Sequence, residues 1–70
     1  MTQSIRVQLN GEVRQVPPAT TIGSLLEAEG LAQRRVAVEV NGAIVPRGQH
    51  GQHTLLDGDK VEIVHALGGG

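Results

Sequence analysis

The sequence predicts an α+β fold in which one short helix packs over one β-sheet. Segments with alternating apolar and polar residues lie on both sides of a single stretch with helical spacing. Two of these segments are followed by Asn-Gly, a pair that favours tight hairpin turns. The chain has 70 residues and lacks Phe, Tyr and Trp. It can therefore bury only one small aliphatic core, with a net stability of roughly 3–5 kcal/mol.

The first two predicted strands form a hairpin. Residues 5–9 alternate apolar and polar side chains, as a half-buried strand does. Asn10-Gly11 then offers a turn in which both residues tolerate positive φ. A second strand over 12–16 returns antiparallel and ends at Pro17-Pro18, because proline cannot donate a ladder hydrogen bond.

A helix of two to three turns is predicted next. Thr20 or Thr21 can provide the N-cap hydroxyl. An apolar stripe with i, i+3, i+4 spacing follows, which faces a core; it consists of Ile22, Leu25 and Leu26. Gly30 is placed to end the helix in a left-handed C-cap, with Leu31 as the accompanying apolar contact.

Three further strands are predicted after the helix. Residues 36–40 and 43–45 flank a second Asn-Gly turn, and the polar segment 47–54 is interpreted as a surface loop. Leu55 and Leu56 are expected to pack under the sheet. The last strand, 60–66, should bury Val61 and Ile63. If this strand and the first one are neighbours, the residues after it leave from the middle of the sheet.

Composition argues against several classes of partner. The formal net charge is −1, and no basic block or aromatic ring is available for a nucleic acid. We expect no membrane partner, since no signal-peptide pattern or long apolar run is present. The chain has no cysteine, so a disulfide and a thiolate zinc site are excluded. We expect a soluble, cytoplasmic protein.

No catalytic constellation is apparent in the sequence. His50 and His53 are three residues apart, but two imidazoles without a third ligand bind metal weakly, so a surface loop is the preferred interpretation over a metal site. His65 could carry a proton near neutral pH, although the exposed end of a strand explains it more simply. No serine or carboxylate pair has the context of a nucleophile or an acid–base pair.

The C-terminal glycines leave one chemically distinctive group. Gly68, Gly69 and Gly70 lack the lysine and following helix of a phosphate-binding loop. They are explained either as a frayed terminus or as a thread that carries the Gly70 carboxylate into a narrow site on another protein. Glycine suits the second role because it has no side chain to clash there. A carboxylate is a poor electrophile, so it would need activation, for example by a nucleotide phosphate.

Three sequence features resemble the ThiS family of small sulfur carriers in thiamine biosynthesis. They are the segment 40–47 (VNGAIVPR), the turn 57–61 (DGDKV) and the Gly-Gly end. The likeness spans the whole chain. It implies a ubiquitin-like β-grasp fold with a mixed sheet of four to five strands on one helix. The domain would then cover 1–66 and the flexible tail 67–70.

The resemblance also implies the chemistry. An E1-like enzyme would use ATP to adenylate the carboxylate of Gly70, and a persulfide donor would convert it into a thiocarboxylate. Thiazole synthase would then take the sulfur. The chain would be a protein co-substrate and not an enzyme, a monomer with neither a cofactor nor a metal of its own.

Docking to these partners is expected beside the tail. The expected docking residues are Val64, Ala66, Leu67 and Arg47, although Arg47 could equally have a structural role beside Pro46. Two residues depart from the family pattern, a third glycine at Gly68 and Gly48 after Arg47. Three alternatives remain: the small subunit of molybdopterin synthase, a ubiquitin-like binding module whose glycine tail is incidental, and a metal-binding protein that uses His50 and His53.

Overall fold

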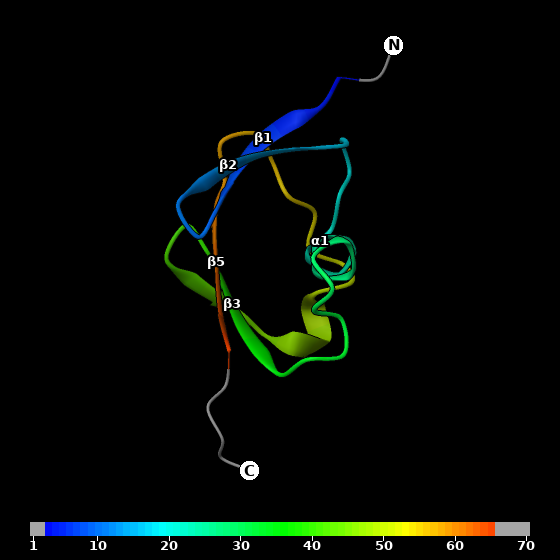
Figure 1. The fold of residues 1–70 in the computed structure, drawn as a ribbon, viewed down its shortest axis with the longest axis vertical. Coiled ribbons are helices and arrows are strands. Elements are labelled where there is room, and N and C mark those ends of the chain that lie inside the picture. The colour runs from blue at the N-terminus through cyan, green and yellow to red at the C-terminus, as the bar shows by residue number, and fades with distance from the viewer. Residues whose placement is uncertain (1–2, 66–70) are drawn as a thin grey trace.

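The computed structural model describes residues 3–65, which form a five-stranded mixed sheet with one α-helix packed against it (Figure 1). The strand order is β2-β1-β5-β3-β4, and β1 and β5 are parallel while the other neighbours are antiparallel. The elements are β1 (Ile5–Leu9), β2 (Glu12–Val16), α1 (Ile22–Ala28), β3 (Val36–Val40), β4 (Ala43–Val45), the 3-10 helix η1 (Arg47–Gln49) and β5 (Lys60–His65). The predicted α+β class and the order of elements are therefore confirmed.

Both Asn-Gly turns adopt the backbone that their sequence predicts. Asn10 and Gly11 have φ values of 50° and 85°, and Asn41 and Gly42 have values of 53° and 86°. Positive φ at both central residues gives the turn a twist that matches the flanking strands. The turns thus fix the registers of the β1–β2 and β3–β4 hairpins, which pair Leu9 with Glu12 and Val40 with Ala43.

Helix α1 is capped at both ends by its own sequence. The Thr21 hydroxyl accepts a hydrogen bond from the Ser24 N–H at 3.0 Å, so the N-cap is Thr21 rather than Thr20. At the other end Gly30 has a φ of 76°, and the Leu31 N–H reaches the Leu26 carbonyl oxygen at 2.7 Å. This is the predicted left-handed C-cap.

The polar segment between β4 and β5 differs from the prediction of a surface loop. It begins with η1, and His50 is only 7% exposed. The carbonyl oxygens of His50 and His53 accept the N–H groups of Gly23 and Ile22 at 2.8 and 3.0 Å. The first N–H groups of a helix have no partner within the helix. The segment is thus held against α1 because it supplies those missing acceptors.

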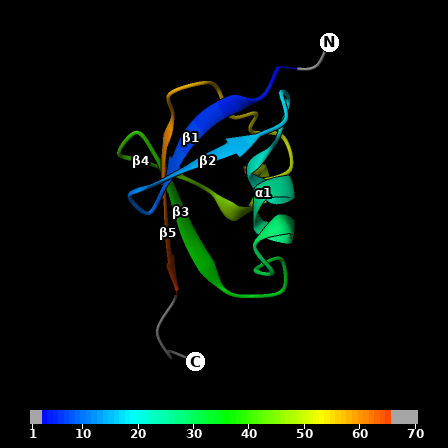
Figure 2. The ribbon, with the colours of Figure 1, turned by 45° about the horizontal axis from the view of Figure 1, so that its top comes forward.

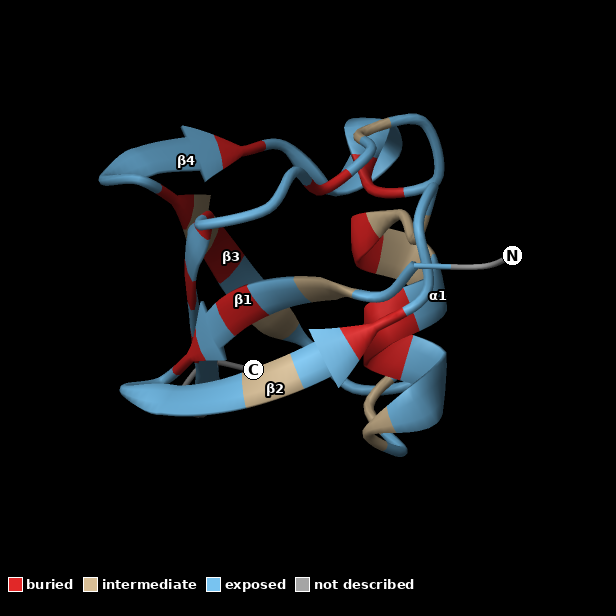
Figure 3. Ribbon diagram, turned by 90° about the horizontal axis from the view of Figure 1, so that it is seen from above, coloured by how far each residue is buried: buried red, intermediate tan, exposed pale blue. Residues whose placement is uncertain are grey.

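One aliphatic core lies between the sheet and α1 (Figures 2 and 3). Its buried members are Val7, Leu9, Val16, Ile22, Leu25, Leu26, Val38, Val40, Val45, Leu55, Val61 and Ile63. The prediction that Leu55 and Leu56 both pack under the sheet is half wrong. Leu55 is 1% exposed, whereas Leu56 is 66% exposed, since the chain turns outward there into the Asp57–Gly58 turn.

Candidate functional site

Strand β5 holds the centre of the sheet and leads to the C-terminal residues. It pairs with β3 along its whole length, from Val40 opposite Val61 to Val36 opposite His65. On its other side it pairs with β1 only at Lys60 and Val61. The first and last strands are neighbours, which puts β5 in the middle of the sheet, and β5 ends at the opposite end of the molecule from the start of β1 (Figure 1).

Beyond the end of β1, the side chain of Asn10 continues the hydrogen bonding to β5. Its Oδ1 accepts the Ile63 N–H at 2.8 Å, and its Nδ2 donates to the Ile63 carbonyl oxygen at 3.3 Å. A side-chain amide thus replaces the peptide group that another residue of β1 would have provided. Because unpaired backbone groups inside a sheet are costly, this clamp holds β5 two residues beyond its last partner in β1.

Asn41 makes a second clamp at the start of β5. Its Oδ1 accepts the Lys60 N–H at 3.0 Å, and its Nδ2 donates to Asp59 Oδ1 at 2.9 Å. The other carboxylate oxygen of Asp59 accepts the Leu56 N–H at 2.8 Å. Asp59, which directly follows the Asp57–Gly58 turn, is buried and links the β3–β4 turn to the segment before β5. Two Asn residues therefore fix β5 from opposite sides.

Most of the predicted site lies outside the described residues. This applies to the reactive carboxylate of Gly70, to the thread residues Gly68 and Gly69, and to the docking residues Ala66 and Leu67. The predicted division between a domain over 1–66 and a tail over 67–70 falls in the same region. The described residue nearest to it, His65, is exposed at the end of β5.

Val64 lies on the sheet face that α1 does not cover. It is 58% exposed, opposite Ala37 of β3, while its neighbour Ile63 points into the core. This confirms the predicted alternation along β5. An exposed apolar side chain four residues before Gly68 is available to a partner, and its docking role remains a prediction.

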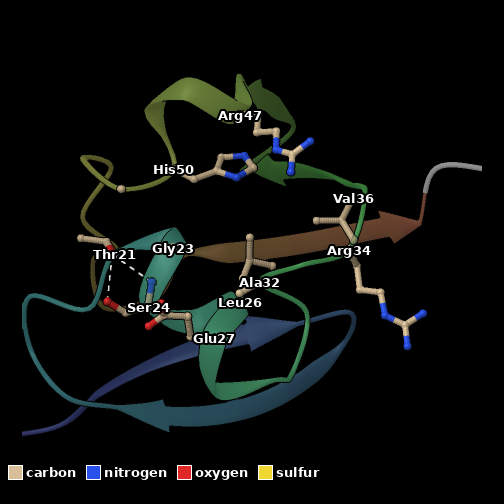
Figure 4. Close-up of a pocket in the computed structure, with 11 residues that line it drawn as sticks. Thr21, Gly23, Ser24, Leu26, Glu27, Ala32, Arg34, Val36, Arg47 and His50 are labelled. Carbon is tan, nitrogen blue, oxygen red and sulfur yellow. Dashed lines mark hydrogen bonds between the residues drawn. The ribbon is translucent and has the colours of Figure 1, made fainter.

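Arg47 lies on the other side of the sheet, in a cleft between α1 and η1 (Figure 4). The cleft has a volume of about 410 Å³. Its lining includes Leu26, Ala32, Arg34, Val36, Arg47 and His50. Arg47 and Arg34 therefore line the same cleft, which also includes Val36, the residue paired with His65. Val64 lies on the opposite face of the sheet.

His50 has a structural role. Its Nε2 lies 3.0 Å from the Val45 carbonyl oxygen, and its own carbonyl caps α1. Among residues 3–65, no three His, Asp or Glu side chains come close enough to hold a metal ion. Nor is any helix in that range long and apolar enough to cross a membrane.

Three features of the structure were not predicted from the sequence. The clamps of Asn10 and Asn41 were missed because an Asn before Gly signals a turn without indicating what its amide contacts. Arg34 was missed because it stands in a short irregular stretch, 30 residues from Val64 and 13 from Arg47 in the sequence. Its place beside the cleft depends on the way this stretch crosses from α1 to β3.

Comparison with known proteins identifies the relatives of this chain. The model of the ThiS family matches residues 7–70. A protein named sulfur carrier protein ThiS from Escherichia coli K12 is 32% identical over 66 residues, which cover 94% of this chain and 100% of that protein. A thiazole synthase from Magnetococcus marinus is 42% identical over 66 residues, but the chain spans only about a fifth of its length.

A solved structure agrees with the fold. The crystal structure of the thiamine biosynthesis protein ThiS from Geobacter metallireducens is 35% identical and superposes with a TM-score of 0.78, covering 94% of this chain and 100% of that one. The expected β-grasp fold, with its mixed sheet and single helix, is thereby confirmed.

Proposed function

The chain belongs to the ThiS family, and we propose that it is the sulfur carrier of thiamine biosynthesis, acting through the carboxylate of Gly70. The observation that carries this proposal is the family match, which runs from Val7 in β1 through all three terminal glycines to Gly70. Two relatives, of which the chain covers 100% and 98%, are named sulfur carrier protein ThiS. The chain is accordingly a carrier and not an enzyme.

Activation of the carboxylate would begin with ATP on an E1-like enzyme. A Gly70 carboxylate oxygen attacks the α-phosphorus, pyrophosphate leaves, and an acyl adenylate forms. The terminal sulfur of a protein persulfide then attacks the acyl carbon and AMP leaves. A thiol cleaves the resulting S–S bond, so that the sulfur stays on Gly70 as a thiocarboxylate while the donor leaves in a disulfide with that thiol. No step needs a catalytic side chain of the carrier.

Thiazole synthase is proposed as the acceptor of the sulfur. A segment similar to this chain makes up about a fifth of proteins that are named thiazole synthase. The presence of a carrier-like segment in such chains supports a functional link between the two. It also favours thiamine over molybdopterin synthesis as the pathway. Because persulfides and thiocarboxylates are readily oxidised, the proposal places the carrier in the reducing cytoplasm.

The fold suits a carrier because it holds the strand before the tail firmly. β5 is central, its side chains Val61 and Ile63 are core residues, and two Asn clamps fix its backbone. β5 itself therefore needs no ordering when an enzyme binds the chain. The domain thereby gives the partner a preformed surface next to His65.

The proposal is tested by intact-mass spectrometry of the full chain after incubation with an E1-like adenylating enzyme, ATP and a persulfide donor. We expect a mass increase equal to the difference between a sulfur and an oxygen atom. Deletion of Gly70 should abolish the increase and leave the urea midpoint unchanged. Gly48→Ala is the matched control, a glycine change away from the tail that should leave the increase intact.

Two results would contradict this function. One is an unchanged mass of the wild-type chain under conditions that convert the Escherichia coli relative. The other is full complementation of a thiamine-requiring strain by the chain without Gly70, which would favour a binding module whose glycines are incidental.

A further inference from the structure

We propose that the cleft between α1 and η1 is a docking site for an acidic segment of the enzyme that adenylates Gly70. The segment would place an apolar side chain in the cleft and carboxylates beside Arg34 and Arg47. This inference rests on the proposed function, because the occupant is the enzyme that receives the tail.

The cleft offers a mixed surface of the kind that proteins recognise. Leu26, Ala32 and Val36 contribute apolar atoms, and about half of the lining is polar. A volume of about 410 Å³ accommodates one or two side chains of a partner. Because Ala32 is exposed and small, it leaves room that a larger side chain would fill.

The charge of the cleft favours an acidic partner. Arg34 and Arg47 both line it and are exposed, and within residues 3–65 the ion pairs are those of Arg14 with Glu12 and Glu29. Glu27 on α1 is the only acid of the lining. Arg35 adds a third exposed cation next to Arg34. Two of the six Lys and Arg residues therefore line this cleft, in a chain whose net charge is −1.

The cleft adjoins the end of the strand that leads to Gly70. Val36 lines the cleft and is paired with His65, the last residue of β5. Arg34 stands two residues before Val36, and Figure 4 shows its guanidinium directed outward, while Arg47 extends beside His50. An enzyme that receives the residues after His65 must approach this end of the molecule and so faces both cations.

A protein segment fits these observations better than a free anion does. A small anion would use the guanidinium groups but leave the apolar lining exposed. Carboxylates on a partner pair with planar guanidinium groups, often through two hydrogen bonds. Charges at the edge of an interface act mainly by steering the encounter, so they affect the association rate and its salt dependence.

The test measures binding of the chain without Gly70 to the adenylating enzyme by surface plasmon resonance, so that no chemistry occurs. The double variant Arg34→Glu/Arg47→Glu should lower the association rate by about tenfold or more at low salt, and the loss should shrink at high salt. The control Arg6→Glu/Lys60→Glu makes the same charge change at the opposite end of β5. It should alter the rate by no more than about threefold.

A second variant separates shape from charge. Ala32→Trp fills the cleft without changing the net charge, and it should weaken the equilibrium affinity by about tenfold while leaving the salt dependence of association unchanged. Urea unfolding checks that each variant is folded, as expected for changes at exposed positions.

Several outcomes would overturn the docking site. One is an equal effect of the two charge-reversal pairs on the association rate, and another is unweakened binding of Ala32→Trp to the adenylating enzyme. The site also falls if the chain without Gly70 and without other substitutions does not bind this enzyme, or if the variants lose affinity only for thiazole synthase in a parallel measurement. The mass assay keeps the two proposals apart. If the wild-type chain gains sulfur but these variants bind normally, the carrier function stands and the docking site falls.

Discussion

Asn10 shows how one residue can serve both a turn and a strand that is distant in sequence. Its backbone adopts the positive φ that the β1–β2 turn requires, and its side chain pairs with both backbone groups of Ile63, 53 residues away. Asn combines these roles because its short amide tolerates the left-handed region and carries both a donor and an acceptor. The amide therefore matters for the strand that precedes the tail.

Two substitutions at Asn10 separate its roles. Asn10→Gly keeps the positive φ but removes the amide, so the free energy of unfolding should fall by about 1–3 kcal/mol because two hydrogen bonds to Ile63 are lost. Asn10→Ala should cost roughly a further 1–2 kcal/mol because a Cβ-bearing residue is strained in the left-handed region. Urea denaturation gives both values. Wild-type stability of Asn10→Gly would show that the clamp contributes nothing.

At the scale of the elements, α1 is stabilised mainly by groups outside its seven residues. Ser24 is capped by Thr21, while Ile22 and Gly23 donate to carbonyls of the segment that follows β4. Isolated helices of this length are not stable in water. The helix and the polar segment therefore form together, and the cleft that includes Arg47 is a product of this contact.

Replacing glycine by alanine should have opposite effects on stability at Gly30, in the C-cap of α1, and at Gly48, in η1. A Cβ at either Gly30 or Gly48 would meet nothing within 4 Å, but only Gly30 has a positive φ, 76°. Gly30→Ala should thus destabilise the fold by about 1–2 kcal/mol through backbone strain alone. Gly48→Ala should stabilise it by about 0.4–1 kcal/mol, since it restricts the unfolded chain. Thermal unfolding of both variants checks this; changes of the same sign would refute the explanation.

At the scale of the whole molecule, the small core leaves little stability to lose. The core contains Val, Leu and Ile side chains only, and a domain of this size has a net stability of roughly 3–5 kcal/mol. One large cavity is therefore comparable with the total. The carrier depends on every buried side chain to keep β5 in place.

Adjacent leucines test this dependence. Leu55→Ala should cost about 2–5 kcal/mol, because Leu55 is 1% exposed, and should leave much of the protein unfolded. Leu56→Ala, at a side chain that is 66% exposed, should change the stability by less than about 0.5 kcal/mol. Circular dichroism with urea titration distinguishes them. Similar losses of stability in the two variants would mean that Leu55 does not lie in the core while Leu56 lies outside it.

Local sequence signals were sufficient for the elements and their ends. The two Asn-Gly turns, the prolines after β2 and the Gly30 cap each act over a few residues, and each is where the sequence predicts it. The N-cap is Thr21, one of the two threonines that the sequence offered. Alternation also identified Val61 and Ile63 as core residues and Val64 as exposed. The family and its glycine end could likewise be recognised without a structure.

Contacts between distant segments decided the rest. The burial of His50, the outward position of Leu56, the clamps on β5 and the placing of Arg34 and Arg47 on one cleft all depend on segments that no local pattern relates. Local rules follow from backbone sterics and short-range hydrogen bonds, which the neighbouring residues fix. Which side chain fills a space or meets an unpaired backbone group depends on how the whole chain packs, because partners from every element compete for the same positions.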